Sequence, residues 1–144
     1  NLTVNSCTFS ANSAAVIGGT IHNDGGNPVV IRNSIVANSP QGGNCGQFLS
    51  DQGNNLDSGT SCGFEPAKGS LNNTNPRLGA LENNGGPTQT LALLPGSPAI
   101  NAVIYNSPNS CPTTDQRGVK RPQGYFCDIG AFEASLAYLP IIFR

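Results

Sequence analysis

The chain has little charge of either sign and contains neither methionine nor tryptophan. Charged residues make up 10% of its 144 residues, and the formal net charge is -1. Proteins that bind nucleic acid or anionic membranes through electrostatics carry a basic patch. The nearest candidate, Arg117 with Lys120 and Arg121, is flanked by Asp115 and Asp128. We therefore expect no nucleic-acid partner.

Long apolar runs are also missing. The longest, residues 136–143, is interrupted by Pro140 and is much shorter than the roughly 20 residues that cross a bilayer. No membrane span is expected. Because methionine is absent and Asn1 stands first, we expect a processed product or a fragment of a longer chain.

Low charge with 37% hydrophobic residues excludes the usual composition of a disordered chain. The 18 glycines and 11 prolines leave little room for long helices. The length suits one domain with a modest core. These features predict an all-β fold.

The cysteines stand at positions 7, 45, 62, 111 and 127. No Cys-x-x-Cys occurs and His22 is the single histidine, so a zinc site lacks ligands with suitable spacing and no cofactor is expected. We predict disulfides Cys45–Cys62 and Cys111–Cys127, because each pair brackets a loop rich in Gly, Pro or Asn. Closing loops of 17 and 16 residues stabilises the fold by about 3 kcal/mol each. Cys7 is left with a partner upstream, on another subunit, or with none.

Two N-terminal segments repeat each other. Residues 2–13 match residues 29–39 when one residue is gapped, which places Asn12 and Asn38 at equivalent corners, 26 residues apart. Apolar and polar residues alternate in both copies, as in strands with one buried face. The pattern predicts a short right-handed parallel β-helix (solenoid), with coils over residues 1–62. Since about three repeats are needed to bury a continuous core, we expect upstream coils or a stacked neighbour.

The rest of the sequence predicts a loop-rich, disulfide-clamped β cap over residues 63–133, followed by a hydrophobic tail, residues 134–144. Short strands are expected at Gly18–Ile21, and at residues 48–49, 55–56, 88–94, 99–104 and 127–132. A long loop is expected over residues 105–125.

Several phrases resemble the C-terminal part of bacterial surface proteins with a choice-of-anchor Q domain, which are related to the polymorphic outer-membrane β-helix repeats. They are Gly-Asn-Asn-Leu-Asp at 53–57, Cys-Gly-Phe at 62–64, Asn-Pro-Arg-Leu-Gly at 75–79, Asn-Gly-Gly-Pro-Thr-Gln-Thr at 84–90, Leu-Pro-Gly-Ser-Pro-Ala-Ile at 94–100, Asp-Gln-Arg-Gly at 115–118, Arg-Pro at 121–122 and Cys-Asp-Ile-Gly-Ala-Phe-Glu at 127–133. The resemblance spans roughly residues 30–133. It implies the end of a secreted or cell-surface β-helix without established catalytic residues. Asn101 departs from it, since Asp is expected there.

The densest charge cluster is Asp115, Arg117, Arg121 and Asp128. A polysaccharide lyase on a β-helix could use such residues, but a clamp on the long loop is favoured because Gly118 and Pro122 indicate turns. Glycosidase chemistry needs paired carboxylates, and the sequence around Glu65, Glu82 and Glu133 indicates no such pair.

Two acidic segments, residues 24–27 and 51–57, offer oxygen ligands for calcium but match no known calcium-loop spacing. Asx turns explain them equally well.

The tail carries the apolar residues that we expect to mediate assembly: Tyr138, Leu139, Ile141, Ile142 and Phe143. A hydrophobic terminal strand is suited to an unpaired sheet edge. The sequence thus predicts a non-catalytic, extracellular or cell-surface structural protein that self-associates head-to-tail or docks in a larger assembly. A carbohydrate-binding adhesive module is the alternative, and a polysaccharide-degrading enzyme is the weaker one.

Overall fold

The computed structural model describes residues 2–47, 49–103 and 110–135, and these residues form an all-β fold, as expected. No α-helix occurs among them. The elements are β1 (Thr3–Asn5), β2 (Thr8–Ser10), β3 (Val29–Arg32), β4 (Ile35–Ala37), β5 (Leu49–Asp51), β6 (Leu56–Asp57), the 3-10 helix η1 (Pro66–Lys68), β7 (Leu78–Glu82) and β8 (Thr90–Leu93).

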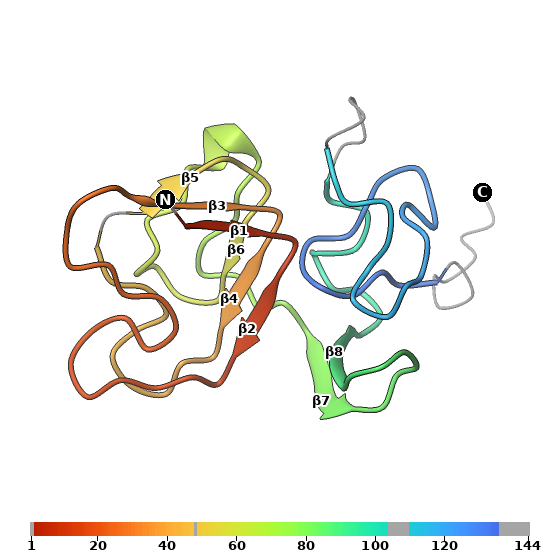
Figure 1. Cartoon of the computed structure of the whole chain (residues 1–144), viewed down its shortest axis with the longest axis horizontal. Coiled ribbons are helices and arrows are strands. Elements are labelled where there is room, and N and C mark those ends of the chain that lie inside the picture. Colours follow the sequence, from red (N-terminus) through yellow and green to blue (C-terminus); the bar gives the residue numbers. More distant parts are fainter. Residues whose placement is uncertain (1, 48, 104–109, 136–144) are drawn as a thin grey trace.

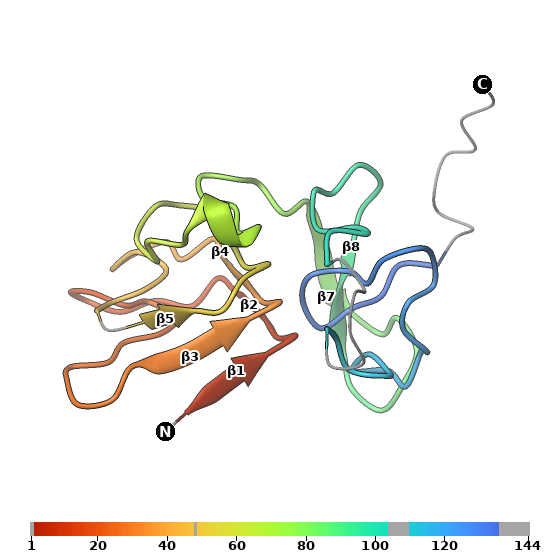
Figure 2. The ribbon, with the colours of Figure 1, turned by 90° about the horizontal axis from the view of Figure 1, so that it is seen from above.

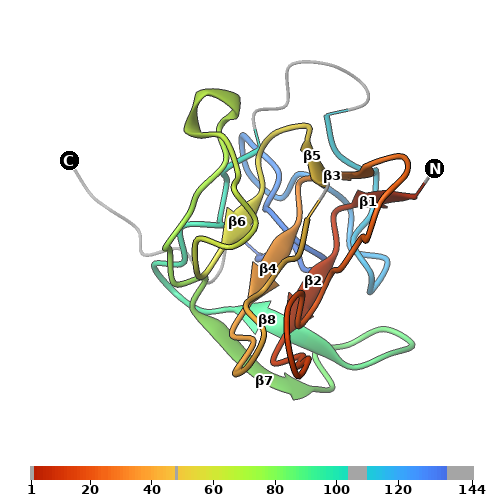
Figure 3. The same ribbon diagram turned by 90° about the vertical axis from the view of Figure 1, so that its left-hand side faces the viewer.

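The first six strands form two parallel sheets, with strand orders β1-β3-β5 and β2-β4-β6. The chain alternates between the sheets, so each pass contributes one strand to each (Figure 1 and, from the side away from the C-terminal residues, Figure 3). Each sheet has three strands, and the described residues do not form a closed solenoid. We call residues 2–71 the coil region.

The register of the coils differs from the predicted alignment. Thr8 pairs with Ile35 and Ser10 with Ala37, so partners lie 27 residues apart. This places Ala11, and not Asn12, opposite Asn38; both Ala11 and Asn38 have a left-handed backbone with φ 59°. The expected equivalence of Asn12 and Asn38 is wrong, because the continuous backbone ladder leaves no space for the gap that the alignment introduced.

A side-chain ladder at one corner connects successive coils. The backbone N–H of Cys7 donates to Ser34 Oγ (3.1 Å), the N–H of Ser34 to Asn55 Oδ1 (2.9 Å), and the N–H of Asn55 to Ser70 Oγ (3.0 Å). The residues that precede the first three are left-handed: Ser6 (φ 53°), Asn33 (φ 50°) and Asn54 (φ 52°). Small polar side chains at this corner therefore satisfy backbone donors that no strand partner reaches.

The C-terminal residues 76–103 and 110–135, which we call the C-terminal lobe, pack against the β2-β4-β6 sheet (Figures 1 and 2). Ile35 and Ala37 of β4 face the lobe, whereas Val36 lies in the core inside the coils, and all three side chains are fully buried. The approach is close at Gly130, where a Cβ would lie 2.5 Å from Thr8 Oγ1. The uninterrupted apolar run of β4 thus follows from burial on both faces.

The strands predicted in the lobe are corrected in part. β8 lies within the expected segment 88–94, but it pairs antiparallel with β7, which the sequence analysis did not predict. Residues 98–101 form a turn instead of a strand, and Val103 makes only a single antiparallel bridge with Cys127. The alternating apolar residues there enter the core between sheet and lobe through turns, so their burial does not require a strand.

Two further expectations, a strand at Gly18–Ile21 and an end of the coils at residue 62, differ in part from the structure. The segment Gly18–Ile21 contributes one isolated parallel bridge, Ile21 with Cys45, instead of a strand. Coil-like pairing continues past residue 62, since Leu71 forms a parallel bridge with Leu56. Within the described ranges no helix is long and apolar enough to cross a membrane.

Candidate functional site

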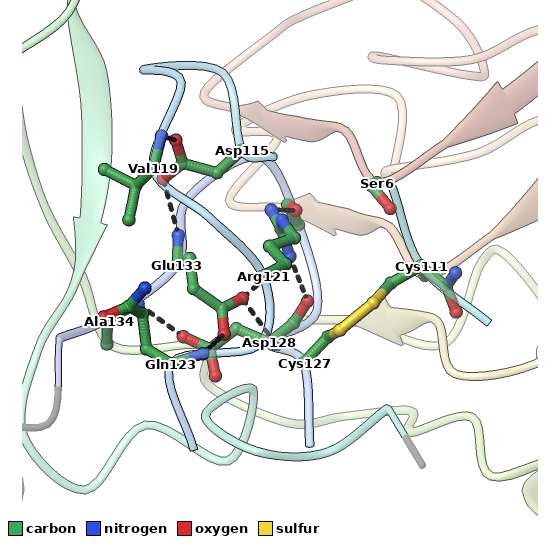
Figure 4. A network of polar contacts seen from close by, with 12 residues as sticks. Ser6, Cys111, Asp115, Val119, Arg121, Gln123, Cys127, Asp128, Glu133 and Ala134 are labelled. Carbon is green, nitrogen blue, oxygen red and sulfur yellow. Dashed lines mark hydrogen bonds and ion pairs between the residues drawn. A yellow bond between two sulfur atoms is a disulfide. The ribbon is translucent and has the colours of Figure 1, made fainter. Parts of the chain in front are cut away.

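The structure brings the four predicted clamp residues together and adds Glu133 to them. Figure 4 shows Asp115, Arg121, Asp128 and Glu133 of this set. Asp115, Arg121, Asp128 and Glu133 are all buried, with Asp128 and Glu133 each 1% exposed. Sequence reasoning missed Glu133. The sequence carried one indication of its role, because Glu133 directly follows the apolar pair Ala131-Phe132, which is expected to be buried. A carboxylate that is buried with such a pair requires a partner.

Arg121 and Glu133 form the most deeply buried ion pair of the described residues. Arg121 Nη1 lies 3.1 Å from Glu133 Oε2, and both side chains are 1% exposed. The guanidinium also donates to the carbonyl oxygens of Asp128 (2.7 Å) and Gly130 (2.6 Å). Burial lowers the pKa of Arg121 and the facing Glu133 carboxylate opposes this. Since burial of a charge requires pairing, each ion here depends on the other.

Asp115 and Arg117 form a second, partly buried pair. Arg117 Nε and Nη2 donate to Asp115 Oδ2 at 2.9 and 2.7 Å, and Nη2 also donates to the Glu133 carbonyl oxygen at 2.6 Å. Burial acts to raise the pKa of Asp115, but the hydrogen bonds from the Glu133 N–H and the Arg117 guanidinium outweigh it, so this pKa is lowered. The guanidinium also stacks on Phe132, 3.6 Å from the ring centre.

Asp128 fixes two distant backbone segments. Its Oδ1 accepts from the Asn101 N–H (2.7 Å) and its Oδ2 from the Ala134 N–H (2.6 Å). Burial raises the pKa of Asp128 to about 6, although both hydrogen bonds act to lower it. The carboxylate therefore ties the turn at 98–101 to the end of the described chain.

The structure joins Cys45 to Cys62 and Cys111 to Cys127, the same two pairs that the spacing favours. The first disulfide lies in the core inside the coils and the second in the core between sheet and lobe. Cys7 is a free, half-buried thiol whose Sγ donates to the Asn5 carbonyl oxygen at 3.4 Å.

The carboxylates of the clamp are hydrogen-bonded within the protein. Both oxygens of Glu133 accept hydrogen bonds, Oε1 from the Gln123 N–H and Oε2 from the Asp128 N–H and Arg121. Both oxygens of Asp115 and Asp128 are likewise occupied by donors of the protein itself.

In the second calcium candidate, residues 51–57, both aspartates accept hydrogen bonds within turns. Asp51 Oδ1 accepts from the Gly53 N–H (2.8 Å), and Asp57 Oδ1 from the Gly59 N–H (2.7 Å), which is the hydrogen bond of an Asx turn. Asn23, directly before the first segment, accepts a longer contact of this type from the Gly25 N–H (3.5 Å). Over the described ranges, no group of three or more His, Cys, Asp or Glu is placed to hold a metal ion.

The two ends of the coil region differ. The end at β5 and β6 is covered, since Asn54 and Leu71 make backbone hydrogen bonds across it to Lys68 and Asn55 (3.2 and 2.7 Å). At the other end, β1 and β2 are the outermost strands of their sheets and have no strand partner on their outer sides within the described part of the chain.

A groove of 430 Å³ lies at the open end, beside β1 and β2. Residues 5–9 line one wall of this groove, and residues of the lobe line the rest: Pro112, residues 114–116, Arg121 and Ala131.

The assembly residues predicted in the tail lie outside the described residues: Tyr138, Leu139, Ile141, Ile142 and Phe143. Comparisons with protein-family models, curated proteins and solved structures each returned no match.

Proposed function

We propose that this protein is a non-catalytic extracellular structural module that joins a larger assembly through its open sheet edge. In this proposal a short right-handed parallel β-helix ends in a disulfide-clamped cap, and further chains add at β1 and β2. The observation that supports it best is the difference between the covered end at β5 and β6 and the uncovered end at β1 and β2.

The β-helical interpretation is supported by two parallel sheets that the chain visits in turn. Their shared register of 27 residues in the first two coils and the ladder of Ser34, Asn55 and Ser70 are typical of stacked coils. The resemblance to choice-of-anchor Q domains favours the same architecture.

Export is supported by the two disulfides, which persist in oxidising compartments and are rare in the cytosol. The non-catalytic interpretation is supported by the buried carboxylates of the clamp, whose oxygens are occupied by backbone N–H groups and arginine. These contacts stabilise the lobe and engage the oxygens of the clamp carboxylates within the protein.

Assembly is supported by the exposed backbone of the outer strands. An unpaired strand edge accepts another extended chain through main-chain hydrogen bonds. When the tail of one copy adds to the open edge of another, the two copies meet through unlike surfaces. Contacts between unlike surfaces that do not close into a ring produce filaments.

The test compares the full chain with a chain that ends at Ser135, which keeps every residue of the clamp. We expect light scattering and negative-stain electron microscopy to show oligomers or filaments of the full chain and monomers of the shortened one. Matching circular dichroism spectra would establish that both are folded. A full chain that remains a compact monomer at high concentration would contradict the proposal.

The alternative is a carbohydrate-binding adhesive module, and one observation favours it. Tyr125 is 92% exposed on the loop between Arg121 and Cys127, whose two ends are held by the clamp and the disulfide. A rigidly presented aromatic ring can stack on a sugar ring. Glycan-array binding that is lost in Tyr125→Ala and retained in Tyr125→Phe would support this function; absence of binding would exclude it.

A further inference from the structure

The groove at the open end has the geometry of a preformed acceptor for an extended chain. One wall contains the start of β2, which pairs with β4 on one side and with no described strand on the other. The walls are joined where the Ala131 N–H donates to Thr8 Oγ1 at 2.9 Å. The far wall is fixed by the Asp115–Arg117 pair and by the disulfide of Cys111. An occupant would therefore enter a site whose shape is already set.

The chemistry of the groove indicates what it accepts. Apolar lining is supplied by Cys7, Phe9, Pro112 and Ala131, and uncharged polar lining by Asn5, Ser6, Thr8, Thr114 and Gln116. The two charged residues of the lining, Asp115 and Arg121, are already engaged in buried ion pairs. A site without free charge beside an unpaired strand edge fits an uncharged, apolar, extended peptide.

One segment of this chain has that composition. Residues 136–143 carry no charge and are apolar except for the hydroxyl of Tyr138. Pro140 lacks an N–H and limits pairing on its own side, which leaves Ile141, Ile142 and Phe143 as an uninterrupted run. This run has the same length as β2, which has three residues.

The occupant is best supplied by a second copy. Ala134, near the end of the described chain, lines a different cavity with Leu93 and Phe132, and no residue after Ala131 lines the groove. Figure 1 places the end of the described chain on the side of the lobe away from β2. The tail of the same copy would therefore have to pass around the lobe to reach the groove.

We propose that residues 141–143 of one copy occupy this groove in a second copy and extend its β2-β4-β6 sheet by one strand. This inference rests on the proposed function and specifies its contact. The groove supplies main-chain pairing along β2, and its apolar lining receives alternate side chains of the incoming strand.

The free thiol of Cys7 in the groove allows a direct test by disulfide trapping. Single variants Ile141→Cys, Ile142→Cys and Phe143→Cys would be oxidised mildly with copper-phenanthroline and oxygen, then separated without reductant. We expect at least one of them to give a ladder of multimers that reductant abolishes. The wild type, with one free cysteine, can give at most a dimer.

Two controls define the background. Cys7→Ser in the trapping variant must abolish the ladder, and Val16→Cys, which is 79% exposed and not part of the groove, must give at least about tenfold less multimer. A product that migrates as a compact monomer would show that the tail binds its own groove and would overturn the inference. The inference would also be overturned if the full chain forms oligomers but the tail variants give no more disulfide-linked multimer than Val16→Cys. That result would leave the proposed function intact. A full chain that never oligomerises would overturn both.

Discussion

The coil region and the C-terminal lobe bury polar groups in different ways. In the coils, neutral hydroxyl and amide side chains repeat at one corner, and each satisfies a backbone donor of the neighbouring coil. In the lobe, whose described residues contain one two-stranded sheet, buried pairs of opposite charge connect segments that have no repeat. The first arrangement spreads stability over many similar contacts, whereas the second concentrates it in a few residues. Single substitutions in the lobe should therefore lower the free energy of unfolding more than single substitutions in the coils.

The largest loss of unfolding free energy is expected from Arg121→Met. Removing the guanidinium leaves Glu133 buried without its ion pair and frees the carbonyl oxygens of Asp128 and Gly130. Breaking one side of a buried pair costs about 3–5 kcal/mol of unfolding free energy. Urea unfolding of the chain that ends at Ser135 would measure it. Lys120→Met, one residue earlier and exposed, should change stability by less than about 0.5 kcal/mol; equal losses in both variants would contradict the clamp.

The next largest loss of stability is expected from removing either disulfide, one of which lies in the coils and the other in the lobe. Because the sequence separations are 17 and 16 residues, loop-closure entropy predicts similar losses of about 3 kcal/mol for Cys45→Ala/Cys62→Ala and Cys111→Ala/Cys127→Ala. Unfolding free energies of the two double variants would show whether they agree. A lobe variant that loses much more than the coil variant would show that the lobe depends on its disulfide beyond loop closure.

A moderate effect of pH is expected from Asp128. Its pKa in the folded protein, about 6, lies above its ordinary value of 3.8, so the folded state binds the proton more tightly than the unfolded state. The resulting stability is fully present below about pH 4 and is lost as pH rises through 6. The contribution of Asp128 should therefore increase as pH falls from 7 to 5. The lowered pKa of Asp115 acts in the opposite sense, at lower pH.

Urea unfolding at pH 7 and pH 5 would measure the contribution of Asp128 as the difference between the wild type and Asp128→Asn. The side chain of Asp128→Asn does not titrate, so its unfolding free energy should lack this increase. An identical pH dependence in both proteins would rule out Asp128 as its source.

The smallest effect is expected in the coils, at the corrected corner. Ala11 has φ 59°, a conformation that Asn tolerates better than Ala. Ala11→Asn should therefore stabilise the protein by about 0.5–1 kcal/mol, whereas Asn12→Ala should change stability little. The melting temperatures of the two variants, compared with that of the wild type, would measure these changes. A loss of stability on Asn12→Ala larger than the gain on Ala11→Asn would favour the original alignment over the observed register.

The sequence predicts the features that depend on local pattern. Alternation identified β1 and β3, and loop composition between cysteines indicated the two pairs that the structure joins. The charge cluster was visible because Asp115, Arg117, Arg121 and Asp128 are close in a chain with little charge.

Features that depend on distant contacts were not accessible. The apolar residues before Glu133 indicate that this acid needs a partner, but not that the partner is Arg121, because the contact needs the lobe to fold back on itself. The strand β7 was missed because its residues are mostly exposed and show no alternation of buried and exposed positions. The coil register required the backbone ladder, since Ala11 has no side-chain feature that marks a corner.

The most direct test of assembly through the open edge is hydrogen exchange of the β2 amides in the full chain, with β4 as the internal reference. We expect slow exchange of β2 at high protein concentration and fast exchange after dilution or in the chain that ends at Ser135, while β4 stays protected throughout. Equally fast exchange of β2 under all these conditions would contradict the account.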